Sequence, residues 1–502
     1  MKRVLLLLII LALFVLTACG GNGGEIQVTE PSTTAPGENV SQSAAMKDKP
    51  IRLPYSTSDS LHPYQATLAM NRQVASLLYD SLYQADGTYK PQRILATAEE
   101  AQTLVLTVSI RKAVFSDGTA LTAKDIAASF LLAKKSAEYK ERLKNFNSCK
   151  AQGEDAAVFT LAQGDPYATA CLDFPIIPAD NKSNDGLPPV GSGRYIIKEE
   201  QGSPVLTPNP RWREKLDYGT ERIVLTNITD PDTLSEGVGI GSLSFAVSDL
   251  SAGTAKRVSA RTTQLPLNNF VYLAFNTNRR AFAEPKLRQA VSLLLNREDL
   301  ALGAFQGNAR PADKPFNPAW YVQENPNVQS QKRDEAQKLI DEAGAAGKQL
   351  QQTALTLLVN KDNPTKAECA RRIMNALQVG GLKVTLNSLS FEAYKTAAAR
   401  GTFDLLLGEV KLTNNMDLST LFSQNGGAHY GIDSAGRAAQ SYGEFRRGAV
   451  TLEAFLDVFA VEMPFVPLLF RGGLAYYDRS LKADIPAAYD ADVYAYVADF
   501  RY

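Results

Sequence analysis

Hydrophobic residues after position 50 recur with two different spacings, which predict a mixture of strands and helices. Between 102 and 110 the apolar residues alternate with polar ones, the pattern of a strand with one buried face. Between 71 and 83 they stand three or four positions apart, as along one face of a helix. Similar patterns predict strands at 51–55, 270–276, 353–359 and 383–389, hairpin-like stretches at 156–161 and 194–206, and helices at 284–296, 333–343 and 366–379.

Local signals refine this pattern and indicate the fold class. Thr122 and Asp125 form a capping box, so a helix is expected to begin there, and Gly344 is expected to end the helix that starts at 333. The strand, helix and strand between 353 and 389 favour a βαβ unit. With 502 residues and about 100 to 200 residues per domain, we predict a mixed α/β protein of at least two lobes.

The N-terminus reads as a targeting segment. Lys2 and Arg3 precede an apolar run over 4–16, which is too short to cross a bilayer that needs about 20 residues. The run ends in Leu-Thr-Ala followed by Cys19, which resembles the bacterial lipoprotein signal, in which a diacylglyceryl group is attached to the cysteine. The alternative is a plain secretory signal with an incidental cysteine. Residues 20–49 are rich in Gly, Ser, Thr and Pro and predict a flexible tether.

Composition narrows the classes of function. The 53 basic and 53 acidic residues give no broad basic field for nucleic acid. The sequence has only two histidines, which are too few to favour a zinc site or a catalytic cluster built from several histidines. The sequence contains no Gly-x-Ser-x-Gly, phosphate loop or dinucleotide fingerprint. We therefore expect a protein that is not an enzyme and that has no cofactor and no metal site.

Cysteine spacing leaves two alternatives open. In an oxidising compartment a disulfide between Cys149 and Cys171 would close a loop of about twenty residues and contribute roughly 3 kcal/mol. The other alternative is that these residues and Cys369 are buried free thiols.

A series of short segments in fixed order carries the strongest functional signal. The most specific is Phe-Ser-Asp-Gly-Thr at 115–119, joined to the capped helix that follows. The series comprises 60–63, Asn71, 78–83, 115–126, 191–195, 209–212, 272–277, 286–291, 296–298 and 463–468. This ordered set resembles the bacterial extracellular solute-binding proteins of family 5, the peptide and nickel class that serves ABC importers.

The resemblance implies an α/β, two-lobed periplasmic-binding-protein-like fold of the class II type, with mixed sheets and a hinge of two strands. By analogy, 1–18 is a lipoprotein signal peptide, and 19–49 is the lipidated cysteine and its tether. Lobe one then covers 50–266 with an inserted subdomain at about 67–177, lobe two covers 267–467, and 468–502 return to lobe one. The mature protein is expected at the cell membrane, lipid-anchored and facing the extracellular or periplasmic side.

The implied function is that of an ABC-importer substrate-binding lipoprotein. It would capture a peptide-like solute between its lobes and deliver it to permease subunits, as a monomer that does not bind nucleic acid. The alternative is a sensor or adhesion lipoprotein on the same scaffold, without transport.

The resemblance also places a ligand-binding site by position. In oligopeptide binders of the family the ligand lies along strand segments on both sides. By position these are 408–412, which begins with Gly408 and Glu409, and 65–68, which ends at Leu68. Tyr272 is expected to form a wall of the site.

One position departs from the family pattern. An aspartate pairs with the α-amine of the ligand in oligopeptide binders, and the corresponding position here is Asn414. A neutral amide supplies no counter-charge for a buried ammonium. We therefore expect Glu409 or Asp417 to serve as the anion.

Overall fold

The structure of the chain is a computed structural model that describes residues 49–180, 187–215, 217–251, 253, 255–322, 328, 331–486, 488 and 493–502. The predicted signal segment, Cys19 and nearly all of the tether lie outside the described residues. Among the described residues, no helix combines the length and apolar character that a membrane span requires.

The first part of the described chain contains two sheets in which most neighbouring strands are antiparallel. The first has the order β1-β12-β11-β10. Its strands are β1 (Ile51–Tyr55), β12 (Ile223–Asn227), β11 (Ser203–Pro208) and β10 (Tyr195–Glu200). The second has the order β4-β5-β9-β8. Its strands are β4 (Ala96–Gln102), β5 (Val105–Ile110), β9 (Ala156–Leu161) and β8 (Phe146–Gln152). Two short hairpins accompany them, β2 (Tyr83–Ala85) with β3 (Pro91–Arg93) and β6 (Ala113–Val114) with β7 (Ala120–Leu121).

A seven-stranded mixed sheet joins the first part to the rest. Its path is β13-β19-β14-β18-β16-β17, with β15 paired to β19. The strands are β13 (Phe245–Ser248), β14 (Arg261–Phe275), β15 (Ala309–Pro311), β16 (Ala354–Asn360), β17 (Lys383–Leu389), β18 (Leu405–Lys411) and β19 (Phe465–Tyr477).

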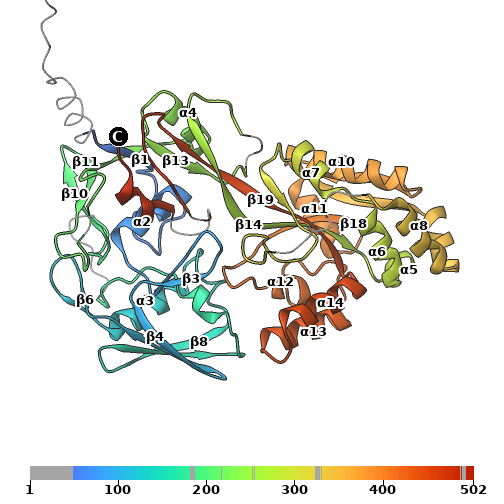
Figure 1. The fold of residues 1–502 in the computed structure, drawn as a ribbon, viewed down its shortest axis with the longest axis horizontal. Helices are drawn as coiled ribbons and strands as arrows, with labels where there is room; N and C mark the ends of the chain where they lie inside the picture. Colours follow the sequence, from blue (N-terminus) through green and yellow to red (C-terminus); the bar gives the residue numbers. More distant parts are fainter. Residues whose placement is uncertain are drawn as a thin grey trace, which may run out of the picture. The chain divides into compact units, whose positions relative to one another are not determined.

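Strands β14 and β19 connect two groups of elements and run side by side as the longest strands in Figure 1. At one end β19 pairs with β13, and Leu265 and Tyr477 share a hydrophobic core with β1. At the other end β14 pairs with β18, and Leu273 and Leu468 belong to a different core. The register between the two strands shifts between Pro266 and Phe270. A register shift of this kind bends a strand pair locally.

Helices cover the sheets and close the cores. In the first part they are α2 (Ala69–Leu78), α3 (Ala123–Ala133), α4 (Leu234–Gly239) and the 3₁₀ turns η1 (Ala168–Cys171) and η2 (Pro231–Thr233). Beyond β14 they are α5 (Arg280–Ala283), α6 (Pro285–Leu293), α7 (Arg297–Gly303), α8 (Arg333–Glu342), α9 (Ala345–Gln352), α10 (Pro364–Val379), α11 (Phe391–Ala399), α12 (Ser419–Phe422), α13 (Arg437–Arg446) and α14 (Leu452–Glu462). The last element is η3 (Val493–Asp499).

Several predicted elements are confirmed. Thr122 and Asp125 form both bonds of the capping box at the start of α3. Strands β16 and β17 pair in parallel with α10 between them, which is the predicted βαβ unit.

Several predicted elements have different bounds. The strand expected at 270–276 is the end of the longer β14, which begins at Arg261, and the helix expected at 284–296 ends at Leu293. The helix expected to reach 83 ends at Leu78, because the next residues turn into extended backbone and the amide of Gly193 binds the Leu78 carbonyl at 2.9 Å. The strand expected over 102–110 is instead the turn and second strand of the β4-β5 hairpin, with positive φ at Thr103.

The three described cysteines are buried free thiols, so the disulfide considered between Cys149 and Cys171 is not formed in this structure. Both side chains pack in one apolar core with α3 and β9. A thiol behaves there as a small hydrophobic group and needs no partner.

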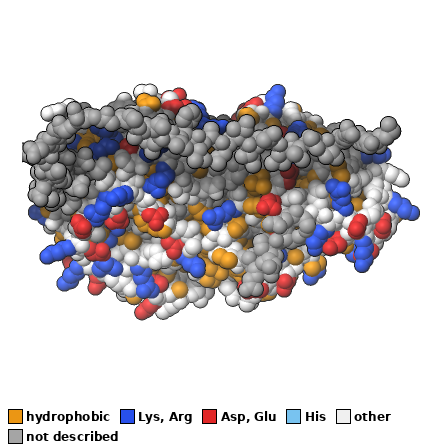
Figure 2. All heavy atoms as spheres, turned by 45° about the horizontal axis from the view of Figure 1, so that its top comes forward, with side chains coloured by type: hydrophobic (Ala, Val, Ile, Leu, Met, Phe, Trp, Pro, Cys, Tyr) orange, Lys and Arg blue, Asp and Glu red, His pale blue; other side chains and the backbone are white. Residues whose placement is uncertain are grey.

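Charges of both signs are mixed on one face of the molecule. On the face shown in Figure 2, lysine and arginine side chains alternate with aspartate and glutamate over the described residues. This agrees with the equal numbers of basic and acidic residues in the sequence.

Candidate ligand-binding site

A cavity of about 410 Å³ lies between the start of α2 and the segment that follows β13. Leu68, one of the predicted site residues, precedes α2 and lies on its wall. Apolar side chains form much of the lining, and its polar part includes Gln73, Asp232, Ser235, Ser248, Asp249, Ser251 and Lys256. The cavity has the size and mixed lining of a site for a small polar solute.

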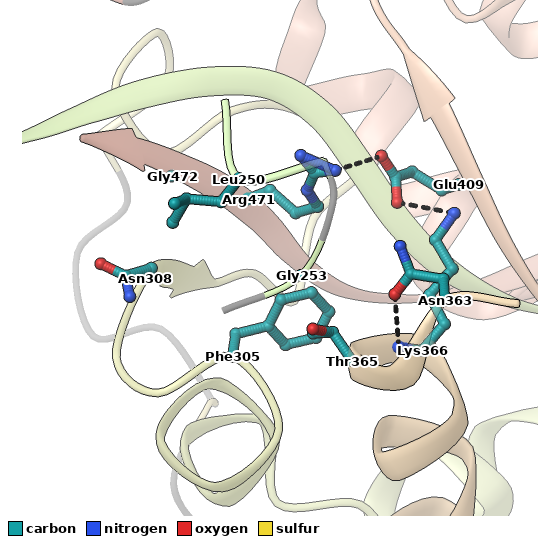
Figure 3. Close-up of a pocket in the computed structure, with 10 residues that line it drawn as sticks. All are labelled: Leu250, Gly253, Phe305, Asn308, Asn363, Thr365, Lys366, Glu409, Arg471 and Gly472. Carbon is teal, nitrogen blue, oxygen red and sulfur yellow. Dashed lines mark hydrogen bonds and ion pairs between the residues drawn. The ribbon is translucent and has the colours of Figure 1, made fainter. Parts of the chain in front are cut away.

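A second, much smaller cavity adjoins the first, since Leu250 and Gly253 line both. Its volume is about 20 Å³, which is room for about one water molecule. Figure 3 shows the side chains around it, where Lys366 from α10 and Arg471 from β19 both point toward Glu409 from β18.

Glu409 is held in a buried ion cluster. Its carboxylate lies 3.0 Å from Lys366 Nζ and 3.3 Å from Arg471 Nη1. Asn269 Nδ2 also donates to Glu409 Oε1 at 2.7 Å. Burial alone would raise the pKa of the Glu409 carboxyl, but Arg471, Lys366 and Asn269 outweigh burial and lower it. The predicted anion is therefore ionised, and two cations of the chain already compensate its charge.

Gly408 and Tyr272 meet as cross-strand partners in β18 and β14. A Cβ at Gly408 would lie 2.4 Å from Tyr272 Cζ, so the glycine leaves room for the ring. The Tyr272 side chain is 1% exposed, stacks on Phe270 and donates its hydroxyl to the Ala428 carbonyl at 3.3 Å. In this structure both residues serve the core, and the tyrosine ring presents no open wall to a ligand.

Asn414 is engaged by a residue from the first part of the chain. It is 2% exposed, and its Nδ2 donates to Asp173 Oδ2 at 2.8 Å. Asp173 also pairs with Arg142 at 2.5 Å. Burial raises the pKa of the Asp173 carboxyl, and Arg142 opposes this effect.

Asp417, the second predicted anion, is likewise compensated. Lys144 Nζ lies 2.8 Å from its Oδ2, and the Tyr442 hydroxyl donates to its Oδ1 at 2.7 Å. Burial would raise the pKa of the Asp417 carboxyl, but Lys144 and Arg446 hold it well below its usual range. These residues border a cavity of about 390 Å³ that does not include Leu68 or Glu409. The structure thus does not bring the six predicted site residues together around one cavity, because Leu68, Glu409 and Asp417 each line a different one.

Sequence reasoning missed the cations that surround Glu409. A signal for Arg471 was present, because it is the one charged residue in the otherwise apolar stretch of β19, and a charge in a buried strand needs a partner. Lys366 gave no such signal, since a lysine in the first turn of a helix is ordinary on a surface. Asp249 was missed because nothing local marks an aspartate that follows a short strand.

The described residues contain no group of three or more His, Cys, Asp or Glu side chains placed to hold a metal ion.

Comparisons with known proteins identify the family. Residues 90–430 match the model of the middle region of the bacterial extracellular solute-binding proteins, family 5. The glutathione-binding protein GsiB of Salmonella choleraesuis is 24% identical over 305 residues, which are 57% of this chain and 59% of that protein. The oligopeptide-binding protein AppA of Bacillus subtilis is 25% identical over 424 residues, 77% of this chain and 76% of the relative.

Solved structures show the same fold. The unliganded open form of the periplasmic murein tripeptide-binding protein MppA superposes with a TM-score of 0.74 at 19% identity, covering 90% of this chain and 97% of that one. NikA of Brucella suis in complex with Fe(III)-EDTA gives a TM-score of 0.65 at 18% identity, with coverage of 88% and 98%. The chain belongs to the bacterial extracellular solute-binding proteins of family 5 and has their two-lobed, mixed α/β fold.

Proposed function

We propose that this chain is the solute-binding lipoprotein of an ABC importer, which captures a peptide-like solute and delivers it to a membrane permease. The observation that carries the proposal is the cavity of about 410 Å³ beside the two connecting strands, in a chain of this family. Its lining joins the start of α2 to the segment after β13 and to Tyr476 of β19.

The chemistry of the cavity supports a polar solute with charged groups. Asp232 and Asp249 line it together with Lys256, and apolar contacts come from Leu68, Met70 and neighbouring side chains. Peptides combine charged termini with an uncharged backbone, and such a ligand suits a wall that has both kinds of surface. Two of the relatives named above bind glutathione and oligopeptides, which agrees with this class.

The proposal includes a hinge between the lobes. Lobe one would cover 50–266 and 468–502, and lobe two 267–467, so that both chain crossings fall within β14 and β19. The register shift between Pro266 and Phe270 supports a bend at this place. Closure about two strands would enclose the solute and give the permease a shape to recognise. Cys19 would carry the lipid that keeps the protein at the outer face of the membrane.

Ligand capture can be tested on the mature chain. Small molecules released by denaturing the purified protein are identified by mass spectrometry, and unfolding temperatures are measured with glutathione, trialanine and nickel-histidine. A ligand at one hundred times its Kd should stabilise the folded protein by about 2.7 kcal/mol. Stabilisation by nickel-histidine with no response to either peptide would contradict the peptide class.

Transport is tested separately from binding. Cells that lack the gene are supplied with the peptide that stabilises the protein, and uptake is compared with that of the complemented strain. Loss of uptake on deletion is expected. Binding with unchanged uptake would favour the alternative of a sensor or adhesion lipoprotein.

A further inference from the structure

The two acidic residues expected to pair with a ligand amine already form ion pairs within the chain. Glu409 shares its charge with Lys366 and Arg471, and the cavity beside it has room for about one water molecule. Asp417 is paired with Lys144 at 2.8 Å. A ligand ammonium at either carboxylate would have to displace a cation of the protein, so neither is available as a counter-ion.

Asp249 occupies a different position. It follows β13, is half-buried and lines the cavity of about 410 Å³. Its Oδ1 accepts the amide hydrogen of Ser251 at 2.9 Å. Among the described residues, no cation lies within ion-pair distance of its carboxylate, in contrast to Glu409 and Asp417. One carboxylate oxygen on the wall of the cavity is therefore uncommitted.

The backbone carbonyl of Asp249 is bound by the buried ion cluster. Arg471 Nη2 donates to the Asp249 carbonyl at 2.6 Å, and the side chain of Arg471 is itself fixed by Glu409. The next residue, Leu250, has a positive φ of 54°, which turns the chain sharply after the aspartate. The buried ion cluster thus positions the aspartate, and a preorganised charge costs less to use in binding.

The apolar surroundings of Asp249 increase the contribution of its charge to ligand binding. Leu68, Met70 and Val247 line the same cavity and are half-buried or buried. An ammonium enclosed against such side chains loses water and needs a counter-ion close by. Asp232 also lines the cavity but is exposed, where solvent screens its charge.

From this arrangement we propose that Asp249 is the counter-ion for an ammonium group of the bound solute, and that the site selects solutes with a free amine. The inference rests on the proposed function, because it concerns the ligand of the same cavity. The position equivalent to the family's aspartate, Asn414, instead joins Asp173. Amine recognition has thus moved to another element.

Isothermal calorimetry with glutathione and trialanine, each in free and N-acetylated form, tests the inference. The key variant is Asp249→Asn, which keeps an oxygen acceptor for the Ser251 amide and removes only the charge. Glu100→Gln is the matched control, because it removes the same charge from an exposed position on β4, outside the lining of the cavity. We expect Asp249→Asn and N-acetylation each to weaken binding by about ten- to a hundredfold, the range of a charge-assisted hydrogen bond.

The outcomes separate the two levels of the proposal. In Asp249→Asn, free and acetylated peptides should bind about equally, whereas Glu100→Gln should keep the preference of the parent within about twofold. A free peptide that binds the parent and Asp249→Asn equally well overturns the role of Asp249 and leaves the peptide-binding function intact. If no peptide binds the parent protein, both the proposed peptide-binding function and the proposed role of Asp249 are wrong. Melting curves confirm that each variant is folded.

Discussion

Asn414→Asp introduces a second carboxylate into a buried contact, and the structure predicts that it destabilises this protein. Asn414 Nδ2 lies 2.8 Å from Asp173 Oδ2 in a buried contact. The substitution replaces this donor by an oxygen and places two carboxylates side by side. Burial already raises the pKa of the Asp173 carboxyl.

The magnitude follows from the geometry. Two unit charges about 4 Å apart repel by about 4 kcal/mol at an effective permittivity of 20. The lost hydrogen bond to a charged group adds about 1.5 to 3 kcal/mol. Arg142, which is 2.5 Å from Asp173, offsets part of the repulsion, and uptake of a proton relieves more. We expect a net loss of about 2 to 4 kcal/mol at neutral pH, or a fall of roughly 2 to 4 °C in melting temperature.

The pH dependence distinguishes repulsion from the simple loss of a contact. One carboxyl of the new pair acquires a folded-state pKa above its unfolded value of about 4. Its cost is therefore absent below about pH 4, grows as the pH rises and is complete above the raised pKa. Melting temperatures of parent and variant, measured by calorimetry from about pH 4 to 8, should diverge as the pH increases.

Asn414→Leu is the matched control, because it removes the hydrogen bond without adding a charge. Its loss should vary little over the same pH range. The reasoning is refuted if Asn414→Asp melts with the parent at every pH, or if its loss has the same flat pH dependence as that of Asn414→Leu.

Three further predictions concern the core, the thiols and the anchor. Gly408→Ala should destabilise the protein by about 1 to 3 kcal/mol, because the new Cβ meets the enclosed Tyr272 ring. Gly472→Ala, where the nearest atom is 3.3 Å away, should cost less in the same melting experiment. Burial raises the pKa of each described thiol, so none should react with an aromatic disulfide reagent in the native protein, and all should be alkylated without reductant after unfolding. A thiol missing after unfolding would contradict the free state. Cys19→Ala should leave an unprocessed or soluble protein, and an intact mass without diacylglycerol in the parent would refute lipidation.

Features encoded within a few residues could be predicted from the sequence. The capping box of Thr122 and Asp125 is complete within four positions, and the alternation of apolar residues in β5 reflects burial on one face. The strand, helix and strand over 354–389 followed from the same local periodicity. The ordered motifs indicated the family, and the resemblance to that family implied the two-lobed fold.

The candidate site depended on contacts that no local pattern specifies. Glu409 and Arg471 are 62 residues apart, and Asn414 and Asp173 are 241 apart. Whether a carboxylate is free to bind a ligand depends on which cations the topology brings beside it, and a buried charge must be paired wherever its partner lies in the chain. The sequence therefore identified which side chains carry charge. Only the tertiary structure determined that nearby cations compensate the charges of Glu409 and Asp417, whereas Asp249 faces a cavity. The physical reason is that electrostatic pairing depends on distance in space and not on separation along the chain.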